Sequence, residues 1–326
     1  MVLFSYIFVE MALNVVYQNT RGLRTKLAEF KQNVYVSDPD VLCVTESWLK
    51  STISDHELVD LNVYNIFRRD RESVVGAKLE GGGVFIAAKP VYSATLMTEY
   101  QSGAEDIWIS IKLKDSKILL ICCVYLPPGN EEAYVSFTSK LGSLSFGENH
   151  VLLVCGDFNF SSTQWLLDGS GNFLEPFNVV PRFSSLIDTF QFHNLMQFNN
   201  IFNSNGRLLD LILCSKFRVL EISHCLNPMV TEDTHHPCVE FFLDIEFPKP
   251  LEFNNNKYFN FKKADYETIN QGIFYFSDTC YSYSSPKSLY IIPGVTGSWY
   301  TLPFFIIFKD AFLKLCTSYI LGMVIF

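Results

Sequence analysis

The sequence lacks several patterns that would each point to a specific kind of site. It contains no Cys-x-x-Cys pair, which argues against a structural zinc site. The glycine triplet 81–83 is not followed by the lysine of a phosphate-binding loop, so close backbone packing explains it better than phosphate binding. The chain also has no excess of positive charge, because its formal net charge is −9. This charge argues against a protein that holds nucleic acid by overall charge alone, but it allows an enzyme whose carboxylates bind cations.

Signals for targeting and membrane insertion are also weak. Residues 1–9 are apolar but have no basic region and no small-residue cleavage site, so no signal peptide is predicted. The apolar stretch 302–326 contains Lys309, Asp310 and Lys314, which would be costly at the middle of a bilayer, so no membrane span is expected. Most of the nine cysteines lie inside apolar runs, which indicates reduced, buried thiols and an intracellular protein, nuclear or cytoplasmic.

The sequence does contain a long series of short apolar, β-rich runs between Leu13 and Phe247. With 48% hydrophobic residues in a chain of 326, it can bury a full core. The predicted strands are 13–17, 41–45, 83–87, 107–113, 118–125, 151–155, 209–214 and 239–245, and a helix is predicted at 25–36. Many strands with few helices favour a four-layered α/β sandwich, in which two packed mixed β-sheets are flanked by helices.

The composition changes near residue 250. Pro248, Pro250 and the asparagine run 254–256 indicate a linker, and the periodicity is lost further along. The predicted divisions are an N-terminal extension 1–12, a folded domain 13–247, a linker or connector 248–271 and an unassigned apolar tail 272–326. We expect the tail to be the least ordered part of the chain.

Polar side chains stand at strand ends along the folded domain, and their order is more informative than any one of them. Five segments present such a group at a predicted strand, and a sixth, 233–237, precedes the last strand. In chain order the polar residues are Asn19, Glu46, Tyr125, Asp157, Asn159, Asp210 and His236. The set contains the groups needed for metal-assisted cleavage of a phosphodiester, which are ligands for a hard cation, a base for the attacking water and groups that stabilise the departing oxygen.

The residue types suggest individual roles. Magnesium prefers carboxylate oxygens, so Glu46 fits a metal ligand, with Asn19 fixing either this ligand or the phosphate. Alternation along an extended backbone would send the side chains of residues 157 and 159 to one side and Phe158 into the core. There they would hold the nucleophilic water and a phosphate oxygen together. His236 would act on the phosphate, polarised by a nearby carboxylate.

The ordered set resembles the endonuclease/exonuclease/phosphatase superfamily. Within it, four segments resemble the endonuclease domain of insect-type non-LTR retrotransposons: 18–26, 42–49, 81–84 and 124–128. The resemblance spans about 13–247, and 259–266 resembles the connector toward reverse transcriptase in such elements. It implies a DNase I-like fold and a DNA-nicking endonuclease. It further implies Mg²⁺ as cofactor with Mn²⁺ as a substitute, the DNA phosphate backbone as partner, and no obligate protein partner.

The resemblance also implies a role for each matching position. Asn19 and Glu46 would lie at the metal site, and Tyr125 would contact the scissile phosphate. Asp157 would position or deprotonate the water, and Asn159 would bind phosphate. Asp210 would orient the histidine or the water network, and His236 would be the late catalytic histidine. The superfamily usually has an aspartate immediately before that histidine. Here the preceding residue is His235, and the nearest acid is Asp233.

Simpler structural explanations stand beside these roles. Asp157 and Asn159 also fit an ordinary turn, and Glu46 a solvated strand end. Asp210 is harder to explain in this way, because burying an unpaired carboxylate inside an apolar strand is costly. The candidate DNA contacts are Arg21, Arg68 and Arg69, although a solvated charged loop at 68–71 explains the last two equally well. Two other functions stay open: a degenerate domain that binds nucleic acid or protein without cutting, and a phosphatase of small phosphorylated molecules.

Overall fold

The computed structural model describes residues 12–71, 81–216 and 218–248. The chain divides into two compact units, Met1–Pro250 and Leu251–Phe326, and all described residues belong to the first. Residues 1–11 of the predicted extension, the linker beyond Pro248 and the apolar tail with its stretch 302–326 lie outside the described residues. Within the described ranges, no helix combines the length and the apolar character that crossing a bilayer requires.

The described strands form two mixed sheets. The six-stranded sheet has the order β13 (Val219–His224), β14 (Val239–Asp244), β1 (Ala12–Asn19), β2 (Val41–Thr45), β4 (Val84–Ala88) and β3 (Asn65–Arg69). The eight-stranded sheet has the order β5 (Thr95–Leu96), β6 (Glu105–Lys112), β7 (Ile118–Tyr125), β8 (His150–Asp157), β12 (Asp210–Ser215), β11 (Leu195–Gln197), β10 (Leu174–Phe177) and β9 (Gln164–Leu167). Short 3₁₀ turns lie at Asp55–Glu57, Pro90–Tyr92, Thr98–Tyr100 and Lys114–Ser116.

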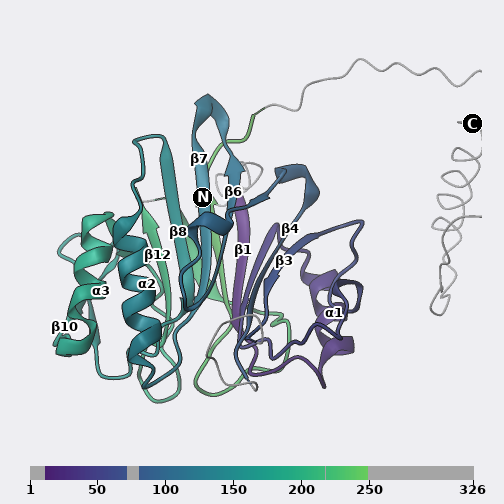
Figure 1. Cartoon of the computed structure of the whole chain (residues 1–326), viewed down its shortest axis with the longest axis horizontal. Coiled ribbons are helices and arrows are strands. Elements are labelled where there is room, and N and C mark those ends of the chain that lie inside the picture. The colour runs from purple at the N-terminus through teal and green to yellow at the C-terminus, as the bar shows by residue number, and fades with distance from the viewer. Residues whose placement is uncertain (1–11, 72–80, 217, 249–326) are drawn as a thin grey trace, which may run out of the picture. The chain divides into compact units, whose positions relative to one another are not determined.

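Helices cover the outer faces of both sheets, which gives four layers (Figure 1). Helix α1 (Leu27–Ser37) packs on the six-stranded sheet, while α2 (Glu131–Ser143) and α3 (Pro181–Phe192) pack side by side on the other. Alternation along β1 explains the arrangement: Val15 points into the core between the sheets, and Val16 points outward to the α1 layer. The four-layered sandwich predicted from the sequence is confirmed.

The local elements follow from the residues that begin and end them. Helix α2 begins after Asn130, whose side-chain oxygen accepts a hydrogen bond from the backbone N–H of Ala133, and α3 begins at Pro181. Helix α1 ends at Asp38, which adopts a left-handed conformation with φ of 43°. The predicted strands and the predicted helix are present with ends shifted by at most two residues. The strands β3, β5, β9, β10, β11 and β13 were not predicted; they are short or partly exposed, so their apolar signal is weak.

The directions of the central strands bring the polar strand ends together. Strands β1 and β2 are parallel, as are β7 and β8, so each pair ends at the same edge of its sheet. In the second sheet Tyr125 lies opposite Asp157, and Asp210 lies opposite Asp157 on the other side. In the first sheet Asn19 lies opposite Thr45, immediately before Glu46. All of these residues therefore reach one end of the sandwich.

Candidate active site

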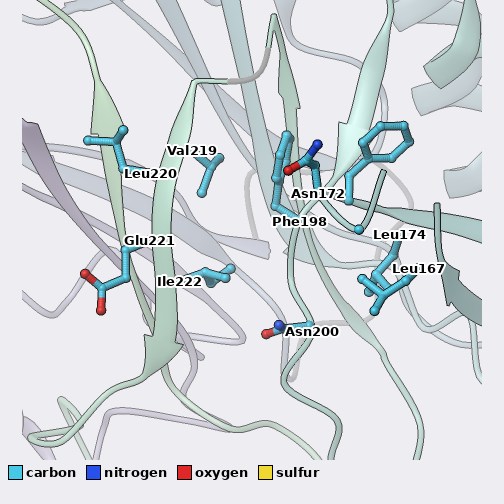
Figure 2. A pocket seen from close by; sticks show the side chains of 11 residues that line it. Leu167, Asn172, Leu174, Phe198, Asn200, Val219, Leu220, Glu221 and Ile222 are labelled. Atoms are coloured by element: carbon cyan, nitrogen blue, oxygen red, sulfur yellow. The ribbon is translucent and has the colours of Figure 1, made fainter. Parts of the chain in front are cut away.

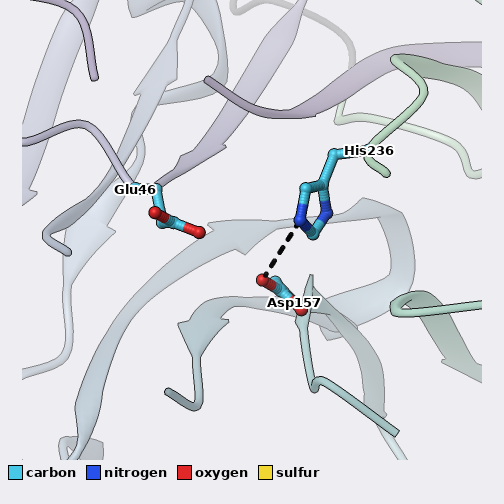
Figure 3. Close-up of side chains that lie close together, drawn as sticks. All are labelled: Glu46, Asp157 and His236. Atoms are coloured by element: carbon cyan, nitrogen blue, oxygen red, sulfur yellow. Dashed lines mark ion pairs between the residues drawn. The ribbon is translucent and has the colours of Figure 1, made fainter. Parts of the chain in front are cut away.

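Three side chains from distant parts of the chain converge at this end of the sandwich (Figure 3). Glu46, Asp157 and His236 each offer one ligand atom, and these atoms lie within 4.8 Å of one another. Asp157 is fully buried, and the Nε2 atom of His236 lies 3.9 Å from its Oδ2 atom. The convergence predicted from the order of the motifs is therefore present for these three residues.

Asn19 joins the two acids across the gap between the sheets. Its amide Nδ2 donates a hydrogen bond to Oε1 of Glu46 at 3.0 Å and another to Oδ2 of Asp157 at 3.0 Å. Its Oδ1 accepts the backbone N–H of Arg21 at 3.1 Å. As placed, Asn19 fixes the separation of the two carboxylates and turns its oxygen away from them. This contact fits the role of fixing the ligand Glu46 better than that of a metal ligand.

The turn after β8 differs from the extended backbone predicted for it. Asn159 has a φ of 53°, in the left-handed region that asparagine tolerates better than most residues. Its backbone N–H donates to Oδ1 of Asp157 at 3.0 Å, and its Nδ2 donates to the carbonyl of Leu126 at 3.0 Å. Phe158 is buried as predicted. The prediction of alternation from 157 to 159 is wrong, because a tight turn held by the Asp157 side chain replaces it.

His236 is oriented by a chain of buried hydrogen bonds. Its Nδ1 lies 2.8 Å from Oδ2 of Asp210, which is the carboxylate contact predicted for this histidine. The hydroxyl of Tyr17 donates to Oδ1 of the same carboxylate at 2.7 Å and lies 2.9 Å from the hydroxyl of Thr45. Asp210 therefore receives one hydrogen bond from β1 and one from the loop before β14, and its burial is compensated.

The crowding of charge changes the pKa values of these groups. Burial raises the pKa of Asp157, and the neighbouring Asp210 carboxylate raises it further. Burial by itself would lower the pKa of His236, but the attraction and hydrogen bond of Asp210, together with Asp157 and Glu46, raise it to about 9. Burial also raises the pKa of Tyr17, so its hydroxyl stays a donor. The imidazole of His236 thus faces two acidic side chains, Asp210 and Asp157, that favour its protonated form.

The residues before His236 form a separate contact. Asp233 accepts the backbone N–H of His235 at 2.8 Å, and its carboxylate pairs with the guanidinium of Arg21 at 3.0 Å. Although partial burial raises the pKa of Asp233, these two partners lower it overall. The His235 ring meets the side chain of Asn205 at 3.2 Å. Asp233 is therefore engaged at the rim of the site and does not stand in for the acid usual at position 235.

Tyr125 ends β7 and lies opposite Asp157. It is 6% exposed, and the guanidinium of Arg71 lies 5.6 Å from the centre of its ring. Burial raises the pKa of its hydroxyl, as do the charges of Glu46 and Asp157. Tyr125 therefore remains protonated beside the acids and can donate a hydrogen bond.

Two arginines predicted as DNA contacts lie in a different environment from the one expected. Residues 68 and 69 end strand β3 and do not form a solvated loop. Arg68 pairs with Asp70 at 2.6 Å, and Arg69 pairs with the fully buried Asp106 at 3.1 Å. Their side chains are only 14% and 15% exposed, whereas that of Arg21 is 45% exposed. Of the three, Arg21 is the one that a nucleic acid would reach most easily.

Sequence reasoning missed two parts of the site. Tyr17 lies in an apolar strand, where an aromatic residue is usually part of the core. The second is Glu105, which pairs with Arg71 at 2.9 Å and accepts the backbone N–H of Gly83. The signal for it was the glycine triplet, because a methyl group built on Gly82 would overlap both charged side chains. The close packing predicted for the triplet is thus a packing of side chains against backbone.

The donor set fits a divalent cation. Buried carboxylates gathered at close range disfavour one another's charge, as the raised pKa of Asp157 indicates. Glu46 and Asp157 provide oxygen ligands of the kind that Mg²⁺ and Mn²⁺ bind.

A separate hollow of about 110 Å³ lies between the β9–β10 hairpin and β13 (Figure 2), but its lining contains none of these residues.

Comparison with known proteins identifies the family. Residues 16–231 match the Endonuclease/Exonuclease/phosphatase family. The chain belongs to this family. A search of curated proteins finds no match. The family match ends before His236, so the position of this histidine beside Glu46 and Asp157 is given by the structure.

Two solved structures illustrate the shared endonuclease/exonuclease/phosphatase fold. An AP endonuclease from Leishmania major aligns with a TM-score of 0.52 and 14% identity, covering 73% of this chain and 89% of that one. The endonuclease domain of TRAS1, a telomere-specific non-LTR retrotransposon, aligns with a TM-score of 0.52 and 12% identity, covering 72% of this chain and 99% of that one. At these identities the likeness concerns the fold.

Proposed function

We propose that this chain is a magnesium-dependent endonuclease that nicks DNA, derived from a non-LTR retrotransposon. The observation that carries the proposal is the convergence of Glu46, Asp157 and His236 within 4.8 Å at the end of two sheets. The four segments that resemble retrotransposon endonucleases support the choice of substrate, and so does the fold shared with an endonuclease domain from such an element.

In this proposal Glu46 and Asp157 hold the cation, and Asn19 sets the distance between them through its two hydrogen bonds. Bound Mg²⁺, or Mn²⁺ in its place, would neutralise phosphate charge and make water more acidic. Asp157 also orients the attacking water or takes its proton. Asn159 and the hydroxyl of Tyr125 bind phosphate oxygens.

His236 presents its Nε2–H to the phosphate, because its Nδ1 is occupied by Asp210. Tyr17 holds Asp210 from the opposite sheet and thereby fixes the plane of the imidazole. Arg21 lies at the rim with its side chain 45% exposed, where it contacts the DNA backbone. Arg68 and Arg69 instead serve the structure through their paired carboxylates.

The test is the conversion of supercoiled plasmid to open circles with Mg²⁺. We expect nicking by the natural chain and its loss in Glu46→Ala and in Asp157→Ala. The exposed Glu175→Ala on β10 is the matched control and keeps full activity. Circular dichroism of each variant checks that the fold is retained. If the natural chain leaves the plasmid intact with both Mg²⁺ and Mn²⁺, the proposed nicking activity is refuted.

One observation favours a second candidate, a domain that binds nucleic acid without cutting it. His235 occupies the position of the usual acid, and its ring is directed to Asn205. This candidate predicts a shift of plasmid mobility without nicking. A shift that requires Arg21 but tolerates Asp157→Ala would support it.

A further inference from the structure

A pair of cysteines closes the loop that carries His236. Strands β13 and β14 are antiparallel with His224 opposite Val239, and the next pair in this register is Cys225 opposite Cys238. The backbone N–H of Cys225 donates to the carbonyl of Cys238 at 2.9 Å. Both cysteines are free, and the Cys238 thiol is close enough to lower the pKa of Cys225. The loop between them, residues 226–237, contains His236.

The spacing of this pair suits a disulfide. Residues opposite each other in an antiparallel strand pair have Cα atoms about 4.5–5.5 Å apart, inside the range of about 4.4–6.8 Å that disulfides span. Glu232 already draws the two strands together, because it accepts the backbone N–H of Cys238 at 2.5 Å and contacts His224 at 2.9 Å. Joining the sulfurs therefore requires only a small approach of the two side chains.

The same chain contains a comparison pair. Cys123 and Cys155 also lie opposite each other, on the parallel strands β7 and β8, but both are 0% exposed in the core between the sheets. Cys225 is 5% exposed, and Leu226 beside it is 89% exposed. Cys225 therefore lies nearer to the solvent than the core pair does. The Cys238 thiol also lowers the pKa of Cys225, which favours its reactive thiolate.

We propose that Cys225 and Cys238 are a modification site that forms a reversible disulfide with a small disulfide oxidant such as oxidised glutathione. The Cys225 thiolate attacks a glutathione sulfur and releases one glutathione thiolate. Cys238 then attacks Cys225 and releases the second. The protein pair loses two electrons, which reduce the glutathione disulfide, and both thiol protons end on the two glutathione molecules. The proposal does not depend on nuclease activity.

The consequence of this bond is a covalent closure of the histidine loop. Val230 of the loop is already fixed to β1 by two hydrogen bonds with the Gln18 side chain, at 2.9 and 3.2 Å. Because the two cysteines already face each other across the strand pair, oxidation would keep the loop in its present position. Closing a loop of this size restricts the unfolded chain, so we expect the Tm to rise by about 5–10 °C.

The experiment uses the full chain with Cys280→Ser and Cys316→Ser, which removes the two thiols outside the described residues. The chain is equilibrated with oxidised glutathione, blocked with a thiol reagent and digested at acidic residues. Such cleavage separates Cys225 from Cys238 at Glu232 and Asp233, so the two peptides stay together only through a disulfide. We expect the joined peptides, lighter by two hydrogen atoms, to separate with dithiothreitol. The Tm increase should be reversed by the same reductant.

The Cys225→Ser variant is the control and should show neither the joined peptides nor the Tm increase. Even if this variant folds poorly, the peptide map of the chain with native Cys225 decides the question. If the thiol reagent still blocks both Cys225 and Cys238 completely after oxidation, the proposal is overturned. So would a bond between Cys123 and Cys155 that forms first.

Discussion

Replacing Tyr17 by phenylalanine tests whether the two sheets jointly orient the candidate catalytic histidine. Tyr17 is fully buried, and its hydroxyl donates at 2.7 Å to Asp210, which in turn contacts His236. A hydrogen bond to a charged group contributes about 1.5–3 kcal/mol. If this energy serves to hold Asp210 and the imidazole in place, its loss lowers the nicking rate constant about 10- to 100-fold. The KM for DNA should not change, because Tyr17 lies beneath the site and does not touch its surface.

The assay is plasmid nicking with the natural chain, Tyr17→Phe, Asp210→Asn and the double variant. A positioning role requires that Tyr17→Phe has little effect once Asp210 is already replaced. Tyr64→Phe is the matched control, because Tyr64 is 3% exposed and its hydroxyl donates to the carbonyl of Pro39 at 2.7 Å, away from the site. It should lower stability and leave nicking unchanged. Full additivity of Tyr17→Phe and Asp210→Asn would refute the reasoning.

Two further predictions concern charged groups that support the site. Arg69→Met leaves the buried Asp106 without its cation and should lower the free energy of unfolding by about 3–5 kcal/mol at neutral pH. Burial holds the pKa of Asp106 above its ordinary value, so protonation stabilises the fold at low pH and this stabilisation is lost as the pH rises through the folded pKa. In urea unfolding, Arg69→Met should therefore lower the free energy of unfolding less at about pH 4 than at about pH 8. An equal decrease at both pH values would contradict this prediction. Gly82→Ala should be more destabilising than Gly129→Ala: both glycines have positive φ, 58° and 74°, but only at Gly82 would the new methyl group displace the Glu105–Arg71 pair. Equal losses in urea unfolding would exclude that displacement.

The sequence predicted the inner strands and the polar residues at their ends, because apolar runs and strand-end motifs are local signals. It did not predict the contacts that Tyr17, Asn19 and Arg69 make from one sheet to the other. Tyr17 is both a core residue and the donor to Asp210, and only the packed fold distinguishes these roles. The arginines of β3 were likewise expected in a DNA-contacting or solvated loop. The partner of Arg69 is Asp106 on the other sheet, which a local sequence pattern does not reveal. At Asn159 the turn depends on the Asp157 side chain, so alternation was the wrong assumption.

The construction of the site explains why it is tied so firmly to the rest of the fold. Glu46, Asp157 and Asp210 repel one another, and their approach is unfavourable until hydrogen-bond donors or a cation compensate it. The donors come from rigid elements: Asn19 and Tyr17 lie on the same strand, two residues apart, and both reach across to the other sheet. One strand therefore sets both the separation of the acids and the orientation of the histidine through Asp210. A change in the register of β1 would disturb both at once.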